Sequence, residues 1–110
     1  MHTVIVTFSL NDLSDEAFRK AATEAAPAFA AVPGLSFKLW LADAERGTYG
    51  GVYLFDTAEA ADHYLASDLF TSAVIDNPHF ADVAIRQSSV LEAATAHTAG
   101  DLHVPVAAGS

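Results

Sequence analysis

Cysteine is absent from this 110-residue sequence, and lysine and arginine together number only five, against 14 aspartates and glutamates. Without cysteine, the chain has no disulfide framework, no thiolate nucleophile and no thiolate metal site. The formal net charge of −9 argues against binding to nucleic acid or to an anionic membrane, because both need clustered positive charge. We therefore expect no nucleic-acid partner and no membrane partner, and a small or neutral molecule as the ligand.

Long apolar runs are also absent. No run approaches the roughly 20 apolar residues that cross a membrane, and the first residues lack the basic and apolar regions of a signal peptide. Together with the lack of cysteine, these features favour a cytoplasmic protein. The length fits one domain, and at this size the burial gained at a dimer interface would add to stability.

Hydrophobic periodicity divides the chain into strands and helices. β-Branched and apolar residues in alternating or continuous runs predict four strands, at residues 2–10, 35–42, 48–55 and 81–91. Apolar residues at helical spacing follow Ser14, which is a suitable N-cap, and predict a first helix that ends at Pro33-Gly34. A second helical region should cover residues 58–75, with a break at Ser67.

The resulting order, β-α-β-β-α-β, is that of the ferredoxin-like α+β folds, in which one four-stranded antiparallel sheet carries both helices on one face. The strands are nevertheless apolar on both faces, and a bare apolar sheet face marks an interface. We therefore predict a homodimer in which two sheets pack face to face and form a dimeric α+β barrel. Val52 and Leu54 should face the partner subunit. The domain should span residues 1–91, followed by a mobile tail or a dimer arm at 92–110.

The segment 33–55 carries the most distinctive motifs of the chain. Two short motifs, Pro33-Gly34-Leu35 and Lys38-x-Trp40, are followed by the strand Gly50-Gly51-Val52-Tyr53-Leu54-Phe55 and by Ala60-x-x-x-Tyr64-Leu65. In these motifs the chain resembles the YdhR-like monooxygenases. That family belongs, with the antibiotic-biosynthesis monooxygenases, to the dimeric α+β barrel superfamily. The resemblance covers roughly residues 1–91.

The resemblance implies both a site and a chemistry. Each subunit of such a barrel has a cavity between its sheet and its helices, where some members oxidise polycyclic phenols with molecular oxygen and without metal, flavin or haem. The deprotonated substrate itself reduces the oxygen. Other members bind haem, isomerise lactones, cyclise polyketides or have no known activity. The resemblance thus implies a cofactor-independent monooxygenase of secondary metabolism that acts on an aromatic or polyketide-like molecule, with haem as the lesser alternative.

Five aromatic residues are candidates for the wall of such a cavity: Trp40, Tyr49, Tyr53, Phe55 and Tyr64. Aromatic rings suit a planar substrate, and a tyrosine hydroxyl, from Tyr49 or Tyr64, can bind a substrate oxygen. Tyr49, Tyr53 and Phe55 share strand parity, and the resemblance places their side of the strand toward the helices and the cavity. The alternative for all five is ordinary core packing.

Three further residues are candidates for catalysis. His63 or His79 would transfer the proton, since imidazole titrates near neutrality, and Arg86 would stabilise developing negative charge. The alternatives are a solvated histidine on a helix, a histidine in a surface loop, and an ion pair between Arg86 and a carboxylate of this chain or of the partner. Lys38 has the same two possible roles as Arg86.

Metal and nucleotide sites lack their usual signatures. The five histidines show no paired helical spacing, and a metal needs three or four converging ligands. No glycine-rich nucleotide loop or serine-nucleophile motif is present, so we expect no metal and no bound cofactor. Two other functions remain open on the same scaffold. One is an isomerase, cyclase or decarboxylase that works by acid–base chemistry, and the other is a non-catalytic protein that binds a hydrophobic ligand.

Overall fold

The computed structural model describes residues 1–102, and residues 103–110 at the end of the predicted tail lie outside the described part. Its strands are β1 (His2–Leu10), β2 (Leu35–Asp43), β3 (Thr48–Phe55) and β4 (Phe80–Ser89). Its helices are α1 (Asp15–Ala30), α2 (Ala58–Leu65), α3 (Asp68–Phe70), the π-helix η1 (Thr71–Ile75) and α4 (Glu92–Thr98). The predicted order of four strands and two helical regions is confirmed.

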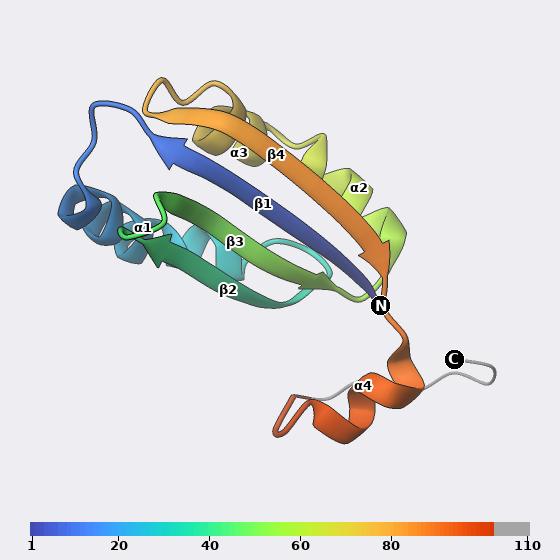
Figure 1. The fold of residues 1–110 in the computed structure, drawn as a ribbon. Helices are drawn as coiled ribbons and strands as arrows, with labels where there is room; N and C mark the ends of the chain where they lie inside the picture. Colours follow the sequence, from blue (N-terminus) through green and yellow to red (C-terminus); the bar gives the residue numbers. More distant parts are fainter. Residues whose placement is uncertain (103–110) are drawn as a thin grey trace.

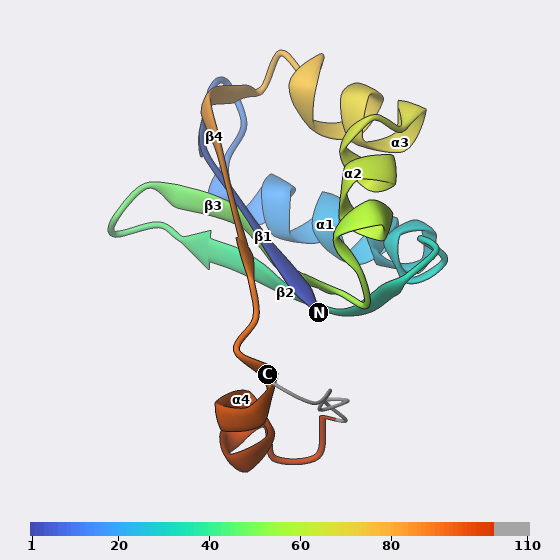
Figure 2. The ribbon, with the colours of Figure 1, turned by 90° about the vertical axis from the view of Figure 1, so that its right-hand side faces the viewer.

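The four strands form one antiparallel sheet in the order β2-β3-β1-β4. Helices α1, α2 and α3 lie on the same side of this sheet, and no helix of residues 1–102 covers its other side (Figure 1, Figure 2). This is the ferredoxin-like α+β architecture that the sequence predicts. Among the described residues, no helix combines the length and the apolar character needed to cross a membrane.

Hydroxyl side chains cap two of the helices, at Ser14 as the sequence predicts and also at Thr57. Ser14 Oγ accepts a hydrogen bond from the Ala17 N–H at 3.1 Å, and Thr57 Oγ1 accepts one from the Ala60 N–H at 3.1 Å. Each cap satisfies a backbone donor that the first turn of a helix leaves free. Ser67 separates α2 from α3, as predicted. The second piece differs from the prediction, because α3 continues into the π-helix η1, whose wider turns join residues five apart.

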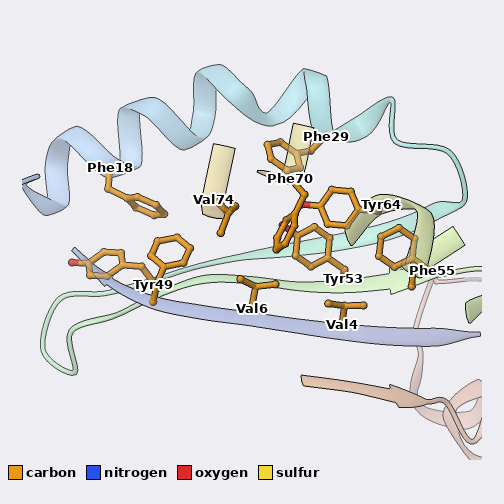
Figure 3. Close-up of a cluster of buried hydrophobic side chains, with 12 residues drawn as sticks. Val4, Val6, Phe18, Phe29, Tyr49, Tyr53, Phe55, Tyr64, Phe70 and Val74 are labelled. Atoms are coloured by element: carbon orange, nitrogen blue, oxygen red, sulfur yellow. The ribbon is translucent and has the colours of Figure 1, made fainter. Parts of the chain in front are cut away.

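Strand parity sorts the apolar side chains onto two faces. Buried side chains of β1 and β3 form one half of the core: Val4, Val6, Phe8, Tyr49, Tyr53 and Phe55. Helical residues form the other half, among them Phe18, Phe29, Tyr64, Phe70 and Val74 (Figure 3). The predicted orientation of the β3 aromatic residues toward the helices is therefore confirmed.

The opposite face of the sheet is apolar, and the described helices leave it uncovered; we call it the open face. Cross-strand pairing places one residue from each strand in a row across it: Leu39, Val52, Ile5 and Arg86. The large side chains of Phe37 and Leu39 are 44% and 50% exposed. The sheet therefore presents an apolar surface on the side without helices.

The segment after β4 contains a helix that the sequence did not predict. Helix α4 has no buried residue and projects away from the sheet and the other helices (Figure 2). The amino group of Met1 donates to Glu92 Oε2 at 3.0 Å, and the Val90 N–H donates to the Met1 carbonyl. Because this alanine-rich helix buries no apolar stripe, hydrophobic periodicity could not reveal it. The division at residue 91 between a domain and a tail or arm stays a prediction.

Candidate active site

A cavity of about 230 Å³ lies between the helix-covered face of the sheet and α1, and we call it the central cavity. Its aromatic lining consists of Phe8, Phe18, Phe29, Trp40 and Phe80. The α1 residues that line it between Phe18 and Phe29 are small, namely Ala21, Ala22 and Ala25. Figure 3 shows the interval along α1 between the rings of Phe18 and Phe29, with Val74 of η1 between them in that view. The face of α1 that carries these alanines, which we call its alanine face, therefore leaves room for the central cavity.

Gly50 and Gly51 of β3 line the central cavity, and a larger residue is disfavoured at each position for a different reason. Gly50 has φ +139°, and a Cβ there would lie 1.9 Å from the carbonyl oxygen of Val6, so another residue fits only if β1 moves. At Gly51 a Cβ would lie 2.8 Å from Lys38 Cε. The Lys38 side chain thus occupies the space that a larger residue at position 51 would need.

The amino group of Lys38 lies in a cage of aromatic rings at the wall of the central cavity. Its Nζ is 3.4 Å from the ring centroid of Trp40, 3.8 Å from that of Phe29 and 4.5 Å from that of Tyr53. None of the ion pairs within residues 1–102 involves Lys38. Burial lowers the pKa of Lys38 to about 7, while the ring faces act in the opposite sense and favour the ammonium form. Near neutral pH this amine can therefore take up or release a proton.

Tyr53 and Tyr64 form a buried hydroxyl pair beside this amine. The Tyr64 hydroxyl donates to the Tyr53 oxygen at 2.8 Å. Burial raises the pKa of Tyr53 to about 12, and burial, together with the neighbouring Tyr53, also raises the pKa of Tyr64. Both hydroxyls are therefore neutral at physiological pH. The Phe55 ring lies 5.5 Å from that of Tyr64, so this end of the layer is a filled aromatic core.

Tyr49 is directed toward the start of α1. Its hydroxyl donates to Asp15 Oδ1 at 2.7 Å, and Arg19 Nε donates to Asp15 Oδ2 at 2.7 Å. The hydrogen bonds from Arg19 and then Tyr49 hold the pKa of Asp15 below its usual range, and the bond to Asp15 raises the pKa of Tyr49. The Tyr49 ring packs edge-on against Phe18, with 5.0 Å between centroids. Tyr49 thus links β3 to α1 through one hydrogen bond and one ring contact.

Trp40 stands at the edge where the central cavity meets the surface, and it is 36% exposed. It lines the central cavity and also two surface grooves between α1 and β2, of about 410 and 330 Å³. The indole packs edge-on against Phe29, with 5.2 Å between ring centroids. Trp40 therefore separates the central cavity from the two grooves.

The three residues predicted for catalysis lie apart from the central cavity. His63 is exposed on α2 and lines a separate hollow of about 190 Å³ near the end of α1. His79 is exposed in the loop before β4, with its Nδ1 3.0 Å from the carbonyl oxygen of Asn11. Arg86 is exposed opposite Ile5 on the open face. The structure brings none of the three to the central cavity, and their catalytic roles stay predictions.

The structure assembles a set of side chains that differs from the predicted one. Trp40 lines the central cavity and Tyr53 contacts its amine, whereas Phe55 and Tyr64 lie behind Tyr53 in the filled core. Lys38, an open alternative in the sequence, is the one ionisable side chain among the residues that line the cavity. The signal that could have singled it out is its shared parity with Trp40 in the motif Lys38-x-Trp40.

Comparison with known families gives a match that spans most of the chain. The model of the family described as "Putative mono-oxygenase ydhR" matches residues 4–101. Among curated proteins, none matches this chain.

Several solved structures share the fold at low sequence identity. A structure described as a putative antibiotic biosynthesis monooxygenase from Deinococcus radiodurans has a TM-score of 0.68 and 20% identity, over 82% of this chain and 92% of that chain. A mutant of MhuD with two manganese protoporphyrin IX molecules per active site has a TM-score of 0.66 and 15% identity, over 83% and 95% of the two chains. A mutant of SnoaB, described as a cofactor-independent oxygenase from Streptomyces nogalater, has a TM-score of 0.64 and 16% identity, over 82% and 92%. At these identities the likeness shows the fold alone.

Proposed function

Because this chain belongs to the ydhR mono-oxygenase family, we propose that it oxidises a flat aromatic or polyketide-like molecule with molecular oxygen in the central cavity. The observation that carries the proposal is the cavity itself, whose walls are apolar and aromatic. Pockets of this kind hold planar apolar ligands. The volume of about 230 Å³ lies below the usual range of about 300–1,000 Å³, which favours a small fused-ring molecule. A place in secondary metabolism and a cytoplasmic location stay predictions.

The proposed reaction needs a substrate that can lose a proton. A phenolic anthrone is an example, because its anion is electron-rich and can give an electron to oxygen. Over the whole reaction a ring CH2 group becomes C=O, one atom of O2 enters the product, and the other atom leaves as water with the two hydrogens. The protein would hold the planar anion, exclude bulk water and stabilise the negative charge.

Haem is the alternative that the likeness to MhuD raises, and the lining of the central cavity does not fit it. Haem iron takes an axial histidine, cysteine, methionine or tyrosine ligand, and within residues 1–102 none of these lines the cavity. In the same part of the chain, no group of three histidine, aspartate or glutamate side chains is placed to hold a metal ion. The side chains at the cavity thus support oxidation without a resident haem.

We further propose that a second copy of the chain covers the open face. The exposed side chains of Phe37 and Leu39, and the row that ends at Arg86, would then be buried between two sheets. Helix α4, which has no buried residue of its own, would serve as the predicted dimer arm. Sedimentation that finds only monomer at micromolar concentration would contradict the dimer.

Oxygen consumption tests the proposed activity. Purified protein would be mixed with 1,8-dihydroxyanthrone and related phenolic anthrones in an oxygen electrode. The matched control is Ala25→Leu, since its larger side chain would occupy the central cavity that Ala25 lines. We expect a rate above the spontaneous background in the natural protein and a rate near background in the variant. Background rates for the natural protein across the substrate panel would count against an oxygenase.

An acid–base enzyme that uses no oxygen is the second candidate, and the caged amine of Lys38 favours it. An amine with a pKa of about 7 can abstract a proton next to a carbonyl group and return it elsewhere in an isomerisation. Product formation under strict anaerobiosis would support this candidate over the oxygenase. A non-catalytic binding protein would hold its ligand with no turnover, either with oxygen or without it.

A further inference from the structure

We propose that Lys38 accepts the proton of the substrate, and that the central cavity selects acidic phenols and enols, which bind as anions beside the resulting ammonium group. The substrate class rests on the proposed function. The site itself rests on the geometry around Nζ.

Lys38 is the ionisable group of the central cavity. Asn77 also lines the cavity, and both ends of its side-chain amide already form hydrogen bonds within the protein. Its Nδ2 donates to the Ala73 carbonyl at 3.2 Å, and its Oδ1 accepts from the His79 N–H at 2.9 Å. Among the described lining residues, the side-chain groups left to bind a ligand oxygen are Lys38 Nζ and the indole N–H of Trp40, and Lys38 is the one that can carry a charge.

In the part of the chain that the structure describes, Nζ has no counter-ion. Trp40 of β2, Tyr53 of β3 and Phe29 of α1 face it with their rings, and the hydroxyl of Tyr64 of α2 donates to that of Tyr53. Within residues 1–102 no carboxylate forms an ion pair with it. Lys38 is half-buried, and a charge taken partly out of water is unfavourable unless it is paired. An anionic ligand would thus complete the site.

The proton transfer needs no other reactant. The O–H bond of the phenol or enol breaks, its electron pair stays on oxygen, and the lone pair of Lys38 Nζ forms the new N–H bond. Burial lowers the pKa of this amine to about 7, so a large share of it is neutral and able to accept at neutral pH. Tyr53 and Tyr64 keep their protons because their pKa values are raised, so they do not compete as acceptors. The aromatic faces then stabilise the ammonium group beside the anion.

4-Nitrophenol tests this inference without oxygen and without turnover, because its phenolate absorbs visible light and its neutral form does not. The spectrum of the bound molecule would be recorded about one pH unit below the pKa of the free phenol. We expect the phenolate band with the natural protein. With Lys38→Met we expect the neutral form and affinity lower by about 10- to 100-fold, the usual effect of losing a hydrogen bond to a charged group.

Lys20 provides the matched control, since it is the other lysine of the chain and is exposed on α1. The Lys20→Met variant should bind 4-nitrophenol as phenolate with unchanged affinity. If Lys38→Met also binds it as phenolate, the inference is wrong.

Lys38→Arg separates proton acceptance from positive charge, because arginine keeps its proton throughout the accessible pH range. Near pH 9, about two units above the pKa of Lys38, the natural protein should take up close to one proton for each phenolate bound. The arginine variant should bind the phenolate with no uptake. Calorimetry in two buffers of different ionisation enthalpy measures the difference.

Neutral 4-nitrophenol on the natural protein, equal proton uptake by the arginine variant, or a lack of saturable binding would each overturn the inference. The outcome is independent of the oxygen electrode. If phenolate binding and proton uptake are found but oxygen consumption is not, the oxygenase is wrong and the role of Lys38 stands.

Discussion

On the helix-covered face of the sheet, the amine of Lys38 is enclosed by aromatic rings, whereas on the open face the guanidinium of Arg86 is exposed opposite Ile5. In the sequence both are cations on strands with apolar neighbours. The difference arises from α1, whose alanine face leaves a cavity beside Lys38. Arg86 pairs with Ile5 on the open face, over which none of the helices within residues 1–102 lies (Figure 2). A charged residue on a strand becomes part of a site only where a second layer excludes water around it.

The largest effect should come from Gly50→Ala, because it disturbs both faces at once. A Cβ at Gly50 would lie 1.9 Å from the Val6 carbonyl oxygen at φ +139°, so β1 and β3 would have to separate. We expect the free energy of unfolding to fall by about 3 kcal/mol or more, measured by urea denaturation. The control is Gly47→Ala, where φ is +63° and no atom lies within 4 Å; it should cost about 1 kcal/mol. Equal losses in the two variants would contradict the close β1–β3 contact.

A carboxylate on the open face should separate assembly from ligand binding. Leu39→Asp would place a charge in the proposed dimer interface, and we expect dimer affinity to fall on the order of 100-fold, measured by analytical ultracentrifugation. Binding of 4-nitrophenol should change little, because Leu39 does not line the central cavity. Ala25→Leu should do the reverse, with binding lost and assembly kept. If one variant abolishes both properties, the two faces are not independent.

Lys38→Met should stabilise the protein in a pH-dependent way. Below pH 7 the amine is protonated in both the folded and the unfolded chain, so the folded state carries the full cost of the half-buried ammonium. Between pH 7 and the ordinary lysine value of 10.5, the folded chain binds fewer protons, and the stability of the natural protein rises with pH. The variant should therefore be more stable by about 2 kcal/mol at pH 6, and this gain should shrink toward pH 10.

Arg86→Met is the comparison for that titration, since Arg86 carries its charge on the other face of the sheet. Its effect on the free energy of unfolding should not depend on pH, because arginine keeps its proton throughout the accessible pH range. Thermal melts of both variants across the pH range measure the two profiles. A flat profile for Lys38→Met would show that the amine is not held in a desolvated site.

The smallest expected change in stability concerns two hydroxyl groups that donate hydrogen bonds to Tyr53, one on each side of the sheet. Tyr64 donates to the Tyr53 hydroxyl at 2.8 Å inside the core, and Thr3 donates to the Tyr53 carbonyl at 3.0 Å on the open face. Tyr64→Phe should cost about 1 kcal/mol, because it removes a buried hydrogen bond. Thr3→Val should cost less than about 0.5 kcal/mol. Chemical denaturation of the two variants tests the order, and a larger loss at Thr3 would contradict it.

The sequence predicts most of the fold because its strands have clear ends. The bounds of β1 and β3 agree with the predicted 2–10 and 48–55, since each is a continuous apolar or aromatic run bounded by polar or turn residues. The end of β4 differs by two residues, within the usual uncertainty of element ends. Helix α4 and the π-turns of η1 were not predicted, because neither has a distinctive apolar period.

The site is less predictable, because it depends on which layer lies over each strand face. Strand parity groups Tyr53 with Tyr49 and Phe55, and the resemblance places that side of the strand toward the helices, as the structure has it. Parity also groups Lys38 with Trp40, but it does not show that the alanine face of α1 leaves a cavity next to Lys38. That space depends on Gly51, whose missing side chain makes room for the lysine. These are tertiary relations between segments far apart in the chain.

The most direct test of a monooxygenase in the central cavity is mass spectrometry of the product formed from 1,8-dihydroxyanthrone under 18O2. We expect one labelled oxygen atom in each product molecule, formed quickly by the natural protein and by Lys20→Met and slowly by Lys38→Met and Ala25→Leu. An enzymatic product without label, or labelled product formed equally fast by Ala25→Leu, would contradict oxygenation in this cavity.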